Sequence, residues 1–254
     1  MTDFRPVILV PHYNHSRQFG GYVPGLIATG VPVLVVDDGS EADQRHALHA
    51  LAAEHGFDVL QRPENRGKGN AVMAGFEHAH SLGYTHALQM DADGQHDPDD
   101  VARFVAAAAE RPDTVICGAP VFGDDAPWIR VWGRKLTDAV VFIETWSAGV
   151  RDSLCGFRIY PLKETLALIA QHRPGERMDF DAEILVTGRW RGQHYHFMNT
   201  RVIYPEAGVS HFRYGQDNVR MVIMHTRLIT LMLLQSPWFL VKLALGRWGR
   251  VTGE

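Results

Sequence analysis

The chain has 254 residues, of which 46% are hydrophobic, and its formal net charge at pH 7 is −4. This length and composition suffice for a folded domain with a sizeable core, and without an excess of basic residues we expect no nucleic-acid partner. The only two cysteines, Cys117 and Cys155, are too few for a disulfide framework and favour the reducing cytoplasm. Residues 1–6 lack the apolar segment of a signal peptide.

The first half of the chain alternates short apolar runs with segments of helical periodicity. Strands are expected at residues 6–10, 31–36, 57–60, 84–90 and 114–117, and helices at residues 17–28, 41–55, 69–82 and 98–109. Near-continuous apolar strands joined by helices indicate an α/β domain with a mostly parallel sheet and helices on both faces. Ligands bind such sheets beyond the carboxyl ends of the strands, and the polar motifs of this chain fall there.

The second half is less regular, and no Ser/Gly-rich linker separates it from the first. We expect a helix at residues 127–148, a loop at 151–158 leading into a short strand, a helix at 178–190 and an edge strand at 194–204. Asp179, Asp181 and Glu183 are open between a solvated helix face and a role in a site. His194 and His196 share one face of the last strand and suit zinc, but no third ligand is evident.

Residues 228–245 near the end of the chain form an apolar run in which Lys242 is the only charge. Its length approaches the roughly 20 residues of a membrane span, but Gln235-Ser236-Pro237 interrupts it. We therefore expect the segment 216–254 to form amphipathic helices, two short ones on a membrane surface. A terminal helix buried against the core and a true span are the alternatives.

Two carboxylates, Asp91 and Asp93, follow the strand expected at residues 84–90. Side chains one residue apart at a strand end point the same way, so the two charges repel unless a cation lies between them. Mg²⁺ and Mn²⁺ suit carboxylate oxygens and keep positions open for phosphate oxygens. The pair therefore predicts a site for a metal and a diphosphate.

Five motifs occur in order: VPHYNH (10–15), VVDDGS (35–40), RPENRGKGNAVMAGF (62–76), MDADGQHDPDD (90–100) and DSLCGFRIY (152–160). With this set the chain resembles the family 2 glycosyltransferases of GT-A fold, and within them the polyprenyl-phosphate (dolichyl-phosphate) mannose and glucose synthase group. The resemblance implies a Rossmann-like fold and an inverting, metal-dependent transfer from a nucleotide-diphosphate sugar to a lipid-linked acceptor such as polyprenyl phosphate. Transfer to a hydroxyl of a glycolipid, lipid or saccharide is the alternative, followed by a non-catalytic nucleotide-sugar-binding module.

The resemblance also implies an organisation: residues 1–215 form the transferase domain, with a nucleotide-sugar lobe at 1–118 and an acceptor lobe at 119–215. With the apolar segment at 216–254, we expect a cytoplasmic protein at the inner face of the membrane. The resemblance assigns the metal, Mg²⁺ or Mn²⁺, to Asp91, Asp93, Gln95 and His211. It assigns the nucleotide sugar to Pro11, Tyr13, Asn14, Asp37, Asp38, Lys68, Asp91 and Ala92, and the acceptor to Arg130, Arg134 and Arg158. Asp91, Asp93 and Asp152 are its catalytic residues, with Asp152 orienting the acceptor or acting as base.

Simpler interpretations compete with several of these assignments. Ser40 fits a turn or a helix cap, Asn14 a plain turn, and Lys68 a solvated surface residue. Arg130 and Arg134 fit a solvated basic face. Cys155 replaces the usual serine of the last motif, and the Glu-Asp pair that serves hydroxyl acceptors in the family is absent. The missing pair favours a phosphate acceptor, which is already anionic and needs no base.

Overall fold

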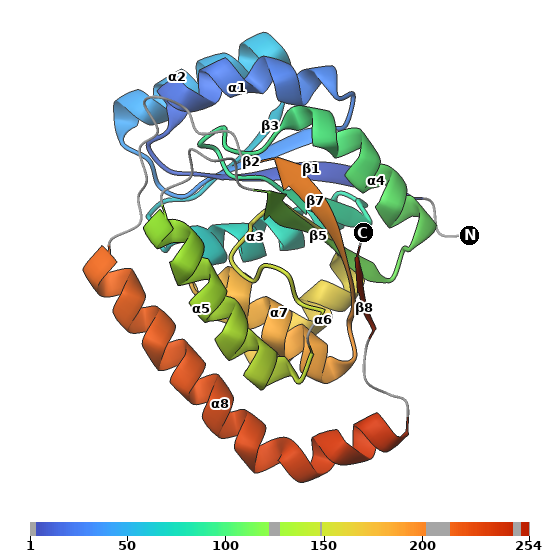
Figure 1. Ribbon diagram of the computed structural model, residues 1–254. Coiled ribbons are helices and arrows are strands. Elements are labelled where there is room, and N and C mark those ends of the chain that lie inside the picture. The colour runs from blue at the N-terminus through green and yellow to red at the C-terminus, as the bar shows by residue number, and fades with distance from the viewer. Residues whose placement is uncertain (1–3, 122–127, 148, 202–213, 246–249, 254) are drawn as a thin grey trace.

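The computed structural model describes residues 4–121, 128–147, 149–201, 214–245 and 250–253. Its centre is a sheet with the strand order β3-β2-β1-β4-β6-β5-β7-β8 (Figure 1). The strands are β1 (Pro6–His12), β2 (Val33–Asp37), β3 (Asp58–Gln61), β4 (His86–Gln89), β5 (Thr114–Val121), β6 (Arg158–Pro161), β7 (His194–Arg201) and β8 (Val251–Gly253). Every pairing is parallel except the two made by β6, so the mostly parallel sheet expected from the sequence is confirmed.

Helices cover both faces of this sheet (Figure 1). They are α1 (Ser16–Ala28), α2 (Ala42–His55), α3 (Lys68–Ser81), α4 (Val101–Glu110), α5 (Trp128–Thr145), α6 (Leu162–His172), α7 (Phe180–Arg191) and α8 (Tyr214–Ala244), with a short 3-10 helix η1 (Pro98–Asp100). Residues of β1 alternate between two cores: Ile8 packs with α1, α2 and α4, whereas Leu9 packs with α3 and α7. The strand is apolar from Pro6 to Pro11 because both of its faces are covered by helices.

The direction of β6 decides what lies beside the end of β4. Because β6 is antiparallel to β4, with Arg158 opposite Gln89, the start of β6 lies at the edge where β4 ends. Residues 152–157, which precede β6, therefore lie beside the loop that carries Asp91 and Asp93. Two motifs about sixty residues apart in the sequence thus meet at one edge of the sheet.

The structure differs from the sequence-based expectation at the C-terminal segment. α8 is one continuous helix with Pro237 inside it, so the expectation of two short helices is wrong. Proline cannot donate to the carbonyl one turn back, but Ser236 Oγ donates to the Leu233 carbonyl at 2.9 Å and satisfies it. Among the described residues, no helix is both long and apolar enough to cross a membrane.

One face of α8 packs on the protein and the other is exposed. Met224, Leu228, Met232 and Phe239 are at most 4% exposed and belong to the core that contains α5 and α7. The Phe239 ring lies 5.5 Å from that of Trp190 on α7. The buried-helix alternative therefore holds for one face of α8. The sequence-based prediction also missed α6 and β8, which pairs with β7.

Candidate active site

Asp37, at the end of β2, is fully buried and bonded on both oxygens. His12 Nδ1 lies 3.0 Å from Oδ1, Ser40 Oγ donates to the same oxygen, and Gln61 Nε2 donates to Oδ2 at 2.6 Å. Burial alone would raise the pKa of Asp37, but these bonds lower it overall. The carboxylate therefore joins the ends of β1, β2 and β3. The nucleotide contact predicted for Asp37 stays a prediction.

Asp38 holds the glycine-rich loop that precedes α3. Its carboxylate accepts bonds from the backbone N–H groups of Arg66 at 3.1 Å and Gly67 at 2.7 Å, and from the Arg62 guanidinium at 2.8 Å. Gly67 has φ +107°, and a Cβ there would lie 2.7 Å from the Glu176 carbonyl oxygen. Only glycine fits this position. The structure thus gives Asp38 a positioning role for the loop that presents Lys68.

The PHYNH segment continues β1, which includes Pro11 and ends at His12. Asn14 has φ +53°, and its Oδ1 accepts the backbone N–H of Glu41, the N-cap of α2, at 2.9 Å. Ser40 Oγ in turn accepts the N–H of Asn14. Asn14 therefore joins two loops, which is more than a plain turn, and Ser40 is not the N-cap of α2. Nucleotide contacts by Pro11, Tyr13 and Asn14 stay predictions.

Lys68, the first residue of α3, lies between two carboxylates. Its Nζ is 2.8 Å from Asp91 Oδ1 and 2.9 Å from Asp181 Oδ2. Burial lowers the pKa of Lys68, but the two carboxylates outweigh it and raise the pKa overall. The side chain is 15% exposed, so the alternative of a solvated surface lysine is wrong.

The pKa values of Asp91 and Asp93 are shifted in opposite directions. Burial would raise the pKa of Asp91, but the charge of Lys68 and the neighbouring His96 lower it overall. Burial and the charge of Asp91 raise the pKa of Asp93. Asp93 Oδ1 accepts the backbone N–H of Gln95 at 3.0 Å, and the ring of His96 stacks on Phe157. The predicted metal ligation by the Gln95 side chain stays a prediction.

The carboxylates of Asp91 and Asp93 fit a divalent metal ion. They supply hard oxygen ligands, and the charge of Asp91 that raises the pKa of Asp93 is the repulsion that a cation relieves. Among the described residues, no three His, Cys, Asp or Glu side chains are grouped around one metal position. Two carboxylates suit an ion that completes its shell with phosphate oxygens and water. His211 lies outside the described residues.

The two histidines of β7 bond the C-terminal segment. His194 Nδ1 accepts the backbone N–H of Arg250 at 2.9 Å, and His196 Nδ1 lies 2.9 Å from Thr252 Oγ1. These contacts give both rings a structural role beside β8. Within the described part of the chain, no group of three possible metal ligands includes them.

Asp152 anchors the loop that leads into β6. Its Oδ2 lies 2.5 Å from Arg134 Nη1, and its Oδ1 accepts the backbone N–H groups of Leu154 at 2.8 Å and Cys155 at 2.6 Å. Arg134 therefore does not belong to a merely solvated basic face. The side chain of Arg130 lies outside the described residues. Burial raises the pKa of the Cys155 thiol to about 12, so the group is neutral at pH 7.

Arg158 is fully buried, which contradicts the predicted contact with an acceptor. Its guanidinium donates to the Asp181 carbonyl at 2.6 Å and to the Ser153 carbonyl at 2.7 Å. The residue joins the start of α7 to the loop before β6. The family motif predicts an acceptor ligand at this arginine, whereas the structure shows that it satisfies backbone carbonyls inside the protein.

Gly156 places the 152–157 loop against the carboxylate cluster. A Cβ at Gly156 would lie 2.9 Å from Lys68 Nζ, 3.0 Å from Gln89 Nε2 and 3.1 Å from Asp91 Oδ2. Gln89, a buried polar residue on β4, donates to Asp181 Oδ1 at 2.9 Å. The prediction of the site omitted Gln89 although its position, two residues before Asp91, puts both on one face of the chain. It left the role of Asp181 open.

Comparison with known proteins places this site in a family. The family model described as "Glycosyl transferase family 2" matches residues 7–174. The polyprenol monophosphomannose synthase of Mycolicibacterium smegmatis is 32% identical over 165 residues, which cover 61% of this chain and 61% of that protein. The UDP-N-acetylglucosamine–dolichyl-phosphate N-acetylglucosaminyltransferase of Methanococcus voltae is 22% identical over 227 residues, 83% of this chain and 90% of that protein.

Among solved structures, this fold matches that of glucosyl-3-phosphoglycerate synthase from Mycobacterium tuberculosis in complex with Mn²⁺, UDP and glucosyl-3-phosphoglycerate. The TM-score is 0.64 at 17% identity, and the match covers 90% of this chain and 79% of that chain. The likeness confirms the predicted GT-A fold, and the resemblance inferred from the five motifs is confirmed by the family match. The family model matches more than half of the residues of this chain, so the chain belongs to glycosyl transferase family 2.

Proposed function

We propose that this protein transfers a sugar from a nucleotide-diphosphate sugar to a lipid-linked phosphate, with polyprenyl phosphate as the favoured acceptor. The observation that carries the proposal is the contact between two motifs at one edge of the sheet. Gly156, in the loop anchored by Asp152, lies against the Lys68–Asp91 pair. Donor and acceptor groups bound to these two motifs would be neighbours. The names of the mycobacterial and methanococcal relatives support the choice of acceptor.

The donor side is formed by Lys68, Asp91 and Asp93. In this proposal Asp91 and Asp93, with Gln95 beside them, would hold Mg²⁺ or Mn²⁺, which would supply positive charge to stabilise the diphosphate leaving group. The fit of the two carboxylates supports this, as does the Mn²⁺ in the complex of the structural neighbour. Lys68 adds a fixed positive charge next to the same position, and Asp38 holds the loop that presents it.

The acceptor side is formed by Arg134 and the loop at 152–157, with Arg130 on the same helix. A guanidinium binds phosphate oxygens well. Asp152 directs both of its oxygens to donors within the protein, so its arrangement suits orienting Arg134 and the loop better than removing a proton. A phosphate acceptor needs no such base. Attack from this side on the anomeric carbon, opposite the diphosphate, would invert its configuration.

A lipid acceptor requires a lipid surface, and α5 and α8 offer an apolar face for it. These helices lie side by side (Figure 1) and carry exposed large apolar residues, among them Trp132 and Leu136 on α5 and Leu234 and Trp238 on α8, each more than half exposed. We propose that the protein binds the inner face of the membrane peripherally through these side chains.

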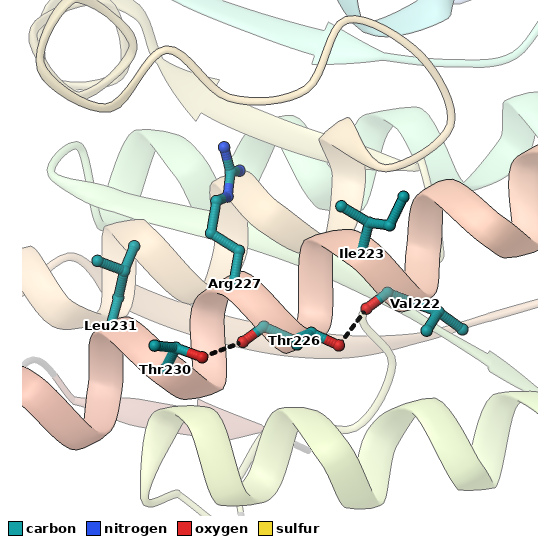
Figure 2. A pocket seen from close by; sticks show the side chains of 6 residues that line it. All are labelled: Val222, Ile223, Thr226, Arg227, Thr230 and Leu231. Atoms are coloured by element: carbon teal, nitrogen blue, oxygen red, sulfur yellow. Dashed lines mark hydrogen bonds between the residues drawn. The ribbon is translucent and has the colours of Figure 1, made fainter.

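Figure 2 shows a groove of about 390 Å³ that is lined by six residues of α8, from Val222 to Leu231. The hydroxyls of Thr226 and Thr230 donate to carbonyls of their own helix at 2.8 Å. Arg227, which pairs with Glu183, also lines the groove. The rest of its lining consists of methyl groups and apolar side chains, which suit contact with an apolar chain.

Two measurements test the proposal. A thermal-shift panel of UDP-, GDP- and dTDP-sugars with Mn²⁺ identifies the donor, because a ligand that binds the native state raises its melting temperature. Transfer of label from that donor is then measured with polyprenyl phosphate and with the corresponding polyprenol in mixed micelles. We expect product only with the phosphate, and only before EDTA is added. Product from the alcohol alone, or full turnover in EDTA, would refute the proposal.

A further inference from the structure

Lys68 presents a problem for metal binding at Asp91. In the structure, an ammonium group already lies within 3.0 Å of both Asp91 oxygens, and a divalent ion must share that carboxylate. Two cations on one carboxylate repel each other. A second carboxylate that holds the ammonium would relieve the competition, and Asp181 is in that position.

We propose that Asp181 is a positioning residue that retains Lys68 and thereby leaves Asp91 available to the divalent ion. This inference rests on the proposed function, because it assumes that the ion binds at Asp91 and Asp93. Asp181 Oδ2 lies 2.9 Å from Lys68 Nζ. It touches neither of the metal-binding carboxylates in the contacts described above, so it acts through Lys68.

The carboxylate of Asp181 is fixed in place. The residue is 4% exposed, at the start of α7. Gln89 Nε2 donates to its Oδ1 at 2.9 Å, while its Oδ2 accepts from Lys68. Arg158 bonds its backbone carbonyl. An acceptor held on both sides in this way cannot follow Lys68 toward Asp91.

The starts of α3 and α7 are also packed tightly against each other. A Cβ at Gly69, next to Lys68, would lie 2.6 Å from Phe180 Cβ, next to Asp181. The backbone N–H of Asn70 donates to the Glu176 carbonyl at 2.8 Å. The spacing between Lys68 and Asp181 is therefore set by backbone contacts and does not depend on their ion pair alone.

The charges explain why this arrangement matters. Asp91, Asp181 and Lys68 together carry one net negative charge, so a divalent ion shared with Asp93 meets an attractive site. If Asp181 is replaced by asparagine, Lys68 keeps its charge and Asp91 is its one remaining carboxylate partner among the contacts described. Lys68 then competes with the metal ion for Asp91. Removing Lys68 as well should end that competition.

The test is a titration with Mn²⁺ alone, in which electron paramagnetic resonance measures free Mn²⁺. The proteins are the native chain, Asp93→Asn, Asp181→Asn, Lys68→Met and the double variant Lys68→Met/Asp181→Asn. Asp179→Asn is the matched control, because it removes a carboxylate from the same turn without touching Lys68. Circular dichroism and melting temperature report on folding.

We expect Asp181→Asn to weaken Mn²⁺ binding by roughly 10- to 100-fold, the usual effect of losing a residue that supports a metal ligand. Asp179→Asn should stay near the native value. In the Lys68→Met background, the added Asp181→Asn change should shift affinity by no more than about twofold, the scatter of independent changes. This rescue separates the proposal from a general loss of structure, which Lys68→Met would not repair.

An equal loss of Mn²⁺ affinity from Asp181→Asn with and without Lys68 would overturn the inference. So would native Mn²⁺ affinity in a folded Asp181→Asn protein. Mn²⁺ binding that does not change in Asp93→Asn would instead refute the metal site of the proposed function, and the role of Asp181 with it. The two failures are therefore distinguishable.

Discussion

Replacing Gly156 with alanine tests whether the donor and acceptor motifs are held in direct contact. The new methyl group would lie 2.9 Å from Lys68 Nζ, 3.0 Å from Gln89 Nε2 and 3.1 Å from Asp91 Oδ2, where ordinary contacts begin at 3.4 Å. Each of these groups must retreat by about 0.3–0.5 Å, or the loop must move outward by as much. None of the three can move freely, because Lys68 and Gln89 both donate to Asp181 and Lys68 also donates to Asp91.

The expected cost has two parts. Overpacking of this kind destabilises a protein by about 1–3 kcal/mol. Because a displacement of about 1 Å in an active site can cost a hundredfold in rate, a shift of half that size should lower kcat/KM by about tenfold. The stability loss follows from denaturant unfolding, and the rate loss from initial rates of label transfer at saturating metal.

Gly133→Ala on α5 is the matched control, since no atom of the described residues lies within 4 Å of a Cβ at that position. In the middle of a helix this change should raise stability by about 0.5–1 kcal/mol and leave the rate unchanged. Native kcat/KM and native stability in Gly156→Ala would show that the 152–157 loop does not press on the Lys68–Asp91 pair. The geometric basis of the proposed function would then be wrong.

Three further predictions concern other parts of the chain. Asp38→Ala removes the acceptor for two backbone N–H groups and for Arg62, so the glycine-rich loop should become more mobile. We expect the KM for the donor to rise about tenfold or more, with little change in the affinity for lipid vesicles. An unchanged donor KM would contradict the role assigned to Asp38. Asp37 has a pKa below its ordinary value in the folded protein, so its stabilising contribution is present above the unfolded value of about 3.9 and is lost as pH falls through the lower folded value. The free energy of unfolding of the native chain should therefore decrease as the pH falls below about 4, and this decrease should be smaller in Asp37→Asn. Identical pH profiles of the two proteins would refute this. Leu234→Glu combined with Trp238→Glu should reduce co-sedimentation with anionic lipid vesicles without lowering the melting temperature, because both side chains are more than half exposed; undiminished vesicle binding would rule out this face as the contact.

The elements that the sequence predicts well are those in which local pattern and tertiary environment agree. Before their polar last residues, His12 and Asp37, β1 and β2 are apolar because each lies between two other strands of the sheet. α2 ends at Gly56, which has φ +74°. The motifs were placed correctly at the carboxyl edge because parallel strands bring their ends together. The hydrophobic pattern of the sequence is sufficient to predict an element where all of its residues have the same kind of surroundings.

The missing parts depend on partners that are distant in the sequence. Pro237 argues for a break in α8, but the Ser236 hydroxyl satisfies the carbonyl that proline leaves free. The positive charge of Arg158 suggests a ligand contact, but its guanidinium is buried and donates to the carbonyls of Ser153 and Asp181. The pairing of Lys68 with Asp181 spans 113 positions, and no local pattern indicates it.

The short strand β8 changes how α8 meets its surroundings. Val251–Gly253 pair with β7, so the strands that precede and follow α8 in the sequence belong to the same sheet. A terminal helix attached at one end would lose much motional freedom when it settles on a lipid surface. Met224 and Phe239 of α8 are already buried, so the helix loses much of that freedom during folding, and the entropy cost of the proposed lipid binding would be lower.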